Sequence, residues 1–249
     1  MIFINAQILD GDFRLRKADI EINDERIVRL ADTLSYTEQD LVVDCAGYTI
    51  VPGFVDIHVH GGAGADTCDA DADGLREMAK FLLTKGVTAF CPTTMTVSNE
   101  EIAKSLETVR SCMADKEGAR IVGVNMEGPF ISPAKKGAQG DEFIQAPDFD
   151  VFKAFYDGCG GIIRLVDIAP ECDVRGDFIE KASKLCTVSV AHTATDYDGA
   201  KAAFRRGATH ATHLFNAMSG MTHRAPGVVG AVFDTDTVCG ELICDGIHI

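Results

Sequence analysis

Short apolar runs separated by polar breaks fill the first fifty residues of the chain. No stretch there repeats apolar residues at the spacing of a helix, and two of the runs flank Asp24-Glu25 like the arms of a hairpin. We therefore expect residues 1–52 to form a small, partial β domain of the sandwich type. Its predicted strands are residues 1–9, 18–23, 26–30, 41–44 and 48–51.

The pattern changes after Pro52-Gly53. Apolar runs of strand length now alternate with stretches of helical periodicity, which indicates α/β architecture with βαβ units around a parallel sheet. A closed (β/α)₈ barrel of the TIM type needs eight such strands, whereas the chain up to Ile249 offers seven. We expect residues 53–249 to form an incomplete barrel that lacks the final β/α unit. The predicted strands are residues 54–59, 88–92, 121–126, 163–168, 188–191, 210–214 and 240–244.

Start and stop signals support the helices between these strands. Ser98 and Glu101 have the spacing of a capping box at the start of one helix. Gly86 and Gly207 stand where two other helices should end, because glycine readily adopts the left-handed conformation that closes a helix. The predicted helices include residues 74–85, 100–113, 178–185 and 197–206.

The composition limits the classes of partner. The 249 residues are 46% hydrophobic, enough for a sizeable core, and they carry a formal net charge of −15 at pH 7. This charge argues against a nucleic-acid groove or an anionic membrane surface as partner, and any anionic substrate would need a local cationic or backbone N–H site. The nine cysteines include no C-x-x-C pair, and we find no signal peptide or membrane span. Both observations favour reduced thiols and a cytoplasmic location.

Acidic and histidine residues stand at the ends of several predicted strands. His58 and His60 are two apart, so on a strand both point to one side. Glu127, His192 and His213 each end a different apolar run. Taken singly, each has an ordinary explanation, such as a solvated loop acid or a histidine satisfied by neighbouring hydroxyl groups. Together they predict a divalent metal site at the carboxyl ends of the barrel strands, where active sites of this fold form.

Two other histidines are expected outside this site. His210 and His213 are three apart, so on a strand they face opposite sides and only one can line the barrel interior. The position at the strand end favours His213, which leaves His210 with a structural role. His223 lies beside Arg224 in a predicted loop, and we expect it at the surface or behind the site.

Longer motifs around these residues resemble the N-acetylglucosamine-6-phosphate deacetylases of the amidohydrolase superfamily. The resemblance extends over essentially the whole sequence. Its first motif is a general entry motif of the superfamily, whereas those after it are more specific. The matching stretches are residues 44–60 (DCAGYTIVPGFVDIHVH), 127–139 (EGPFISPAKKGAQ), 212–218 (THLFNAM), 223–230 (HRAPGVVG) and 245–248 (DGIH).

The resemblance implies which residues bind metal. Glu127, His192 and His213 would be the principal ligands, and His58 with His60 would hold a second ion, as in the family branch that has this pair. Such a mixed nitrogen and oxygen donor set suits Zn, Fe(II), Mn or Co, at one or two ions per chain. A divalent ion supplies what hydrolysis of an inert amide needs, an activated water and a polarised carbonyl.

The resemblance also implies an amino-sugar phosphate as substrate and a homodimeric enzyme, in which Arg224 would reach across the dimer interface. Ala138 or Gln139 would line the sugar, and position 139 varies between His and Gln in the family. Ala225 stands where Glu is frequent. The residues that match the sugar-phosphate site are Asn216, Ala217, Arg224 and His248.

One element of the resemblance has no counterpart in the chain. The family's general acid/base is an aspartate after the eighth strand, which would lie beyond Ile249, so no catalytic residue of that kind is present. We expect residues 1–249 alone to be poorly soluble or oligomerised through open sheet edges. We also expect them to bind metal more weakly and to deacetylate at a negligible rate.

Two other functions stay open at this point. Another amidohydrolase, of the dihydroorotase or hydantoinase type, would share the H-x-H entry motif, but such enzymes usually bridge two metals with a modified lysine on the fourth strand. Residues 163–168 contain no lysine, whereas Glu127 supplies a carboxylate one strand earlier. A non-catalytic remnant that binds metal or sugar phosphate without turnover is the second alternative.

Overall fold

The computed structural model describes every residue from Met1 to Ile249, in two compact units. The first comprises Met1–Gly53 and the second Phe54–Ile249, and each has its own hydrophobic core. No helix in either unit is both long and apolar enough to cross a membrane.

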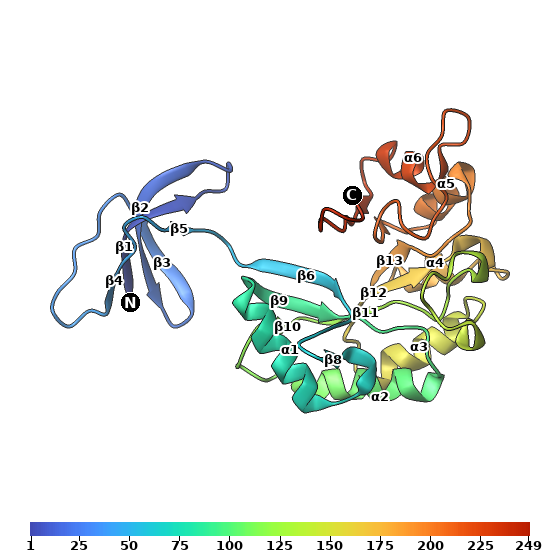
Figure 1. The fold of residues 1–249 in the computed structure, drawn as a ribbon, viewed down its shortest axis with the longest axis horizontal. Helices are drawn as coiled ribbons and strands as arrows, with labels where there is room; N and C mark the ends of the chain where they lie inside the picture. The colour runs from blue at the N-terminus through green and yellow to red at the C-terminus, as the bar shows by residue number, and fades with distance from the viewer. The chain divides into compact units, whose positions relative to one another are not determined.

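The first unit is one five-stranded sheet (Figure 1). A hairpin of two antiparallel strands pairs with one edge of the first strand, and two short parallel strands pair with its other edge. Ala6, Ile8 and Ile20 lie in its small core. The predicted strands and hairpin are therefore confirmed, but the unit holds a single sheet where we expected a sandwich. The strands are β1 (Ile2–Leu9), β2 (Leu15–Asn23), β3 (Arg26–Ala31), β4 (Val42–Asp44) and β5 (Thr49–Ile50).

The second unit has a parallel sheet that contains the seven predicted strands in chain order. The strands pair in two runs, the first in the order β10-β9-β6 and the second in the order β11-β12-β13-β14-β15. A parallel bridge between Thr93 and Asn125 joins the two runs. A separate small hairpin, β7 (Gly61–Gly62) with β8 (Ala65–Asp66), follows the first strand. The sheet strands are β6 (Phe54–Val59), β9 (Val87–Pro92), β10 (Arg120–Ile121), β11 (Val124–Met126), β12 (Ile163–Ile168), β13 (Thr187–Val190), β14 (His210–Ala211) and β15 (Cys239–Gly240).

β10 and β11 are two parts of one predicted strand. The strand is interrupted around Gly123, where a Cβ atom would lie 2.9 Å from the backbone oxygen of Ile162. Only glycine allows so close an approach between neighbouring strands. The first and last strands, β6 and β15, do not pair with each other, so the sheet is not a closed barrel.

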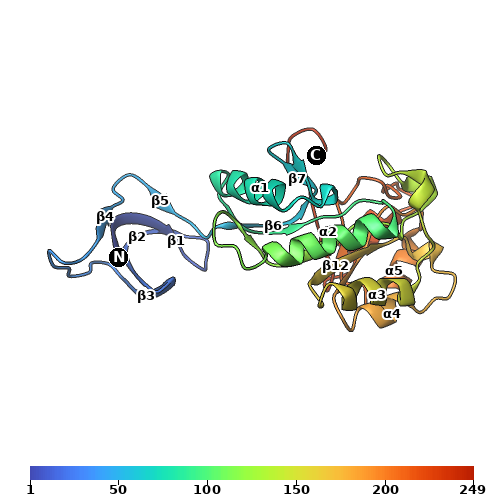
Figure 2. The ribbon, with the colours of Figure 1, turned by 90° about the horizontal axis from the view of Figure 1, so that it is seen from below.

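Helices follow the strands and pack against their neighbours in chain order, as α1 on α2, α2 on α3 and α3 on α4 (Figure 2). The four predicted helices are confirmed, and α3 and α6 are additional. The helices are α1 (Ala72–Thr84), α2 (Asn99–Cys112), α3 (Phe149–Gly158), α4 (Phe178–Ala182), α5 (Tyr197–Arg205) and α6 (Gly227–Phe233). Short 3₁₀ turns are η1 (Thr67–Asp69), η2 (Pro133–Lys135), η3 (Asp141–Phe143) and η4 (Pro170–Cys172).

Aromatic side chains form the centre of the main core. Phe130, Phe152 and Phe178 are fully buried, and the Phe178 ring centroid lies 5.1 Å from that of Phe130 and 5.6 Å from that of Phe152. Tilted pairs of this kind are favourable beyond the area they bury. The packing fixes α3 and α4 close to the loop that begins at Glu127, and so supports the strand ends that carry the site.

The start of α2 has the predicted capping box. The Ser98 hydroxyl accepts from the Glu101 N–H at 3.2 Å, and the Glu101 carboxylate accepts from the Ser98 N–H at 3.0 Å. We predict that Ser98→Ala lowers the free energy of unfolding by about 1 kcal/mol, because a helix N–H loses its acceptor. Ser98→Asp is the matched control and should stay close to the wild type. Equal stability of the alanine and aspartate variants in urea unfolding would contradict a role for this cap.

Candidate metal centre

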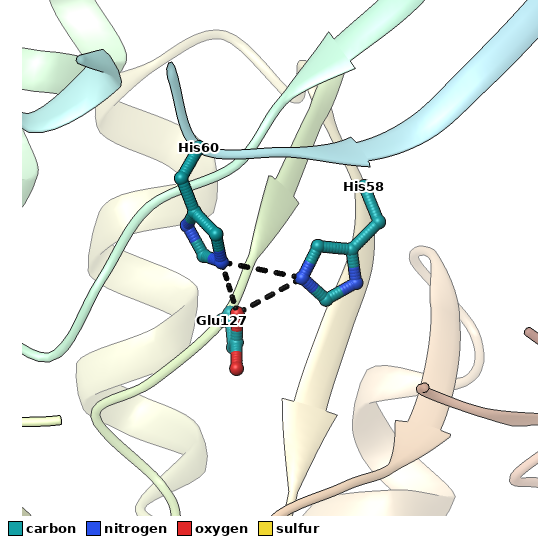
Figure 3. Close-up of side chains that lie close together, drawn as sticks. All are labelled: His58, His60 and Glu127. Atoms are coloured by element: carbon teal, nitrogen blue, oxygen red, sulfur yellow. Dashed lines mark hydrogen bonds and ion pairs between the residues drawn. The ribbon is translucent and has the colours of Figure 1, made fainter. Parts of the chain in front are cut away.

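Four strands of the second unit end at one group of acidic and imidazole side chains. His58 lies in β6 and His60 follows it, Glu127 follows β11, and His192 and His213 come soon after β13 and β14. Because parallel strands all end on one edge of their sheet, these residues meet although they are far apart in sequence. Figure 3 shows three of them, with both His58 and His60 pointing at Glu127.

Glu127 is the centre of this group and is only 2% exposed. Its Oε2 lies 3.0 Å from His58 Nε2 and 2.8 Å from His60 Nε2. Its Oε1 contacts His192 Nε2 and lies 3.6 Å from His213 Nε2. One carboxylate therefore belongs to two groups of three ligand atoms, His58–His60–Glu127 and Glu127–His192–His213.

The hydrogen bonds of the Nδ1 atoms determine which ring nitrogen of His192 and of His213 faces Glu127. His192 Nδ1 lies 2.9 Å from the Lys135 carbonyl oxygen, and His213 Nδ1 lies 3.1 Å from that of Asn216. Carbonyl oxygens only accept, so both Nδ1 atoms carry hydrogen and each Nε2 of a neutral ring presents a lone pair. These two Nε2 atoms are 3.1 Å apart, beside a carboxylate oxygen. Such a set of converging electron-rich atoms fits a cation.

The electrostatics of the side chains agree with a cation site. Burial alone would raise the pKa of the Glu127 carboxyl, but hydrogen bonds with the four imidazoles outweigh burial and hold the pKa well below its usual value. Burial would lower the pKa of His58, but its contacts with Glu127 and Glu241 raise it to about 11. Positive charge next to Glu127 is therefore strongly favoured.

The backbone has a left-handed conformation at His192 and at His213, and this conformation sets the direction of both rings. His192 and His213 have φ values of +43° and +31°, which L residues adopt only where the surroundings enforce them. The carboxylate of Glu171 accepts from the Thr193 hydroxyl and from the Ala194 N–H at 2.6 Å, and so holds the turn after His192.

Of the residues expected to contact the sugar phosphate, two lie beside the metal ligands and two do not. Asn216 and Ala217 adjoin the ligands, since the Asn216 carbonyl accepts from His213 and that of Ala217 accepts from the Thr193 N–H. Arg224 and His248 are exposed and make no hydrogen bond to the metal ligands; His248 pairs with Asp245 at 2.8 Å.

The loop that contains residues 137–139 adjoins one ligand. A Cβ atom on Gly137 would lie 3.6 Å from the His192 ring, which places the following residues beside this histidine. Ala138 is exposed, whereas Gln139 is buried and its amide oxygen accepts from the Thr96 N–H at 2.6 Å.

His210 and His213 lie closer to one common residue than the alternation of side chains along a strand predicts, although His210 belongs to neither ligand group. Both adjoin Glu241, with His210 Nε2 3.7 Å from its Oε1 and the His213 N–H 3.4 Å from its Oε2. β14 ends at Ala211, and the left-handed backbone at His213 breaks the alternation on which the expectation depended. His210 Nδ1 contacts the Ser189 hydroxyl at 3.0 Å, and burial lowers the pKa of this ring.

Two buried carboxylates near the ligands escaped the sequence analysis. Glu241 directly follows β15 and contacts His58, and Asp167 lies in β12 and accepts from the Thr212 hydroxyl at 2.8 Å. Both stand in or just after a predicted strand, so an acid in an apolar run was a signal that could have identified them.

The chain belongs to the amidohydrolase family, which matches residues 49–245. Among curated relatives, the N-acetylglucosamine-6-phosphate deacetylase of Bacillus subtilis is 40% identical over 208 residues, which cover 82% of this chain and 52% of the relative. That of Homo sapiens is 34% identical over 261 residues, covering 99% of this chain and 63% of the relative. The chain thus spans about half to two thirds of the length of these relatives.

Solved structures agree with this family. The N-acetylglucosamine-6-phosphate deacetylase of Pasteurella multocida superposes on the whole of this chain with a TM-score of 0.90 and 29% identity, over 65% of its own length. That of Mycobacterium smegmatis also covers the whole chain, with a TM-score of 0.88, 30% identity and 70% of its own length. The arrangement of the strands therefore matches that of the corresponding part of these deacetylases.

Metal content tests the ligand assignment. We predict that the purified chain binds one to two divalent ions, and that His192→Asn removes at least one, because the ring supplies one of the three ligand atoms of the Glu127–His192–His213 group. His223→Asn is the matched control, since His223 is exposed and lies outside both ligand groups. Elemental analysis that finds the wild-type metal content in His192→Asn would refute the assignment.

Asp167 should make the stability of the metal-free chain depend on pH. Burial, and then the charge of Glu127, raise the pKa of Asp167 from 3.8 to about 8. The folded chain then keeps a proton that the unfolded chain releases, so stability is lost as the pH rises between these values. Asp167→Asn cannot titrate, and its free energy of unfolding relative to wild type should increase with pH, by at most about 1.4 kcal/mol per unit. A difference that stays constant in chelator-treated protein over this range would contradict the assignment.

Proposed function

We propose that this chain forms the metal- and substrate-binding part of a hydrolase that removes the acetyl group from N-acetyl-D-glucosamine 6-phosphate. The products would be D-glucosamine 6-phosphate and acetate, as in amino-sugar catabolism. The observation that carries the proposal is the pair of ligand groups that share Glu127 at the carboxyl ends of parallel strands. Relatives named for this activity match along the whole chain, which supports the proposal further.

The donor set supports two divalent ions per chain. Glu127 offers one oxygen to His58 and His60 and the other to His192 and His213. Nitrogen and carboxylate donors suit Zn, Fe(II), Mn or Co. A bound divalent ion supplies Lewis acidity toward an amide carbonyl and toward water. The protein's own part is to orient His58, His192 and His213 through their Nδ1 hydrogen bonds.

The phosphate of the substrate needs a local cationic site, because the chain as a whole is acidic. Arg224 is exposed and can meet an anion, whereas His248 is exposed but pairs with Asp245 and would have to exchange this partner for phosphate. The backbone N–H groups near Asn216 and Ala217 adjoin the ligands. A structure of the Mycobacterium smegmatis relative was solved in complex with N-acetyl-D-glucosamine-6-phosphate. In the proposed homodimer, Arg224 would act across the subunit interface.

A dihydroorotase- or hydantoinase-like activity has less support. Such enzymes usually bridge two metals with a modified lysine on the fourth strand, whereas β12 contains no lysine and carries the buried Asp167. The carboxylate between the two ligand groups is Glu127, which follows the preceding strand.

Binding measurements test the substrate. We predict that the Co²⁺-loaded chain binds N-acetylglucosamine 6-phosphate at least about tenfold more tightly than N-acetylglucosamine, because a charged hydrogen bond to phosphate contributes roughly 1.5–3 kcal/mol. Arg224→Ala should weaken binding of the phosphorylated sugar alone. Arg205→Ala is the matched control, an exposed arginine at the end of α5.

Isothermal titration calorimetry gives the affinities, and the visible spectrum of Co²⁺ reports whether the acetamido group reaches the ion. Equal affinity for the two sugars would refute the phosphate site. An unchanged Co²⁺ spectrum on saturation with the phosphorylated sugar would refute the placement of the amide at the metal.

A further inference from the structure

Glu241 has a fixed position at the end of the last strand. It directly follows β15, and its backbone is held on the neighbouring strand, with its N–H donating to the Ala211 oxygen at 2.9 Å and its oxygen accepting from the Leu214 N–H at 2.8 Å. Its side chain is 12% exposed. The carboxylate is therefore placed by the sheet itself.

The side chain of Glu241 reaches a ligand on the first strand. Its Oε2 lies 2.9 Å from His58 Nδ1, across 183 positions of sequence. A carboxylate oxygen accepts, so Nδ1 of His58 keeps its hydrogen, and Nε2, 3.0 Å from Glu127 Oε2, is the nitrogen that would give up its proton to a cation. The contact thus selects both the tautomer and the direction of the ring.

The two ligand groups differ in what orients them. His192 and His213 are held by backbone carbonyls of nearby loops. In the other group, His60 Nδ1 is buried without a hydrogen-bond partner, so the Glu241 contact is the one that orients an imidazole there. Glu241 also brings a negative charge to an ion site that shares its only carboxylate ligand with its neighbour.

We propose that Glu241 is a positioning residue for the ion at His58, His60 and Glu127, and that the ion at Glu127, His192 and His213 depends on it much less, because the contact of Glu241 with that group is one longer hydrogen bond, 3.4 Å, from the His213 backbone N–H. The inference deepens the proposed function, since it rests on the two-ion site, but it does not involve the sugar. Loss of such an outer carboxylate typically weakens metal binding 10–100-fold.

Titration of the metal-free chain with Co²⁺ alone tests this inference by equilibrium dialysis and visible absorption. The wild type should bind two ions. Glu241→Ala should bind one ion as the wild type does and the other about 10–100-fold more weakly, as His58→Asn does. Glu241→Gln keeps an oxygen that accepts from Nδ1, so its affinity for the weaker ion should lie between those of the wild type and Glu241→Ala.

Asp173→Asn is the matched control, because it changes another carboxylate of the same unit that is buried but contacts backbone N–H groups and Arg206, and no histidine. It should bind both ions like the wild type. Circular dichroism of the metal-free variants establishes whether they fold. If Glu241→Ala does not fold, the ion affinities of Glu241→Gln are compared with those of the wild type instead.

The inference is overturned if a folded Glu241→Ala chain binds both ions like the wild type, or loses both equally, or if Asp173→Asn shows the same selective loss. It is overturned as well if the wild type binds a single Co²⁺. If Glu241→Ala does not fold, wild-type affinity for both ions in Glu241→Gln would also overturn it. Failure of the chain to distinguish the two sugars would refute the proposed substrate and leave this result unaffected.

Discussion

The buried carboxylate of Glu127 is the feature on which the rest of the site depends. A charge that is 2% exposed is tolerated only if it is compensated, and here four imidazoles from three other strands surround it. Since its two oxygens face different pairs of rings, the geometry supports two cations joined by one carboxylate. The parallel sheet makes this possible, because it brings the ends of strands that are far apart in sequence to one edge.

Hydrogen bonds from neighbouring loops fix the orientation of two of the ligands, His192 and His213. Backbone carbonyls hold the Nδ1 atoms of His192 and His213, and Glu171 holds the turn that follows His192. These contacts keep the rings in left-handed backbone conformations that the chain would not adopt on its own. Preorganisation of this kind is what a metal site needs to bind its ion in one geometry.

Much of this could be predicted from the sequence, because strand periodicity and strand-end acids and histidines are local signals. β6 and β12 begin and end where predicted, and the five proposed metal ligands meet. Non-local features were missed. The role of Glu241 depends on the approach of the last strand to the first, and the alternation expected from His210 to His213 is lost because the chain leaves strand geometry at His213. The single sheet of the first unit depends on pairings that periodicity does not specify.

Electron paramagnetic resonance of the chain loaded with two equivalents of Mn²⁺ tests the central claim, that Glu127 joins two ions, most directly. A shared carboxylate couples the spins of the ions, so the account predicts the spectrum of an exchange-coupled pair, which should disappear in Glu127→Ala. A wild-type spectrum of isolated Mn²⁺ ions at full loading, or a coupled spectrum that persists in the variant, would contradict it.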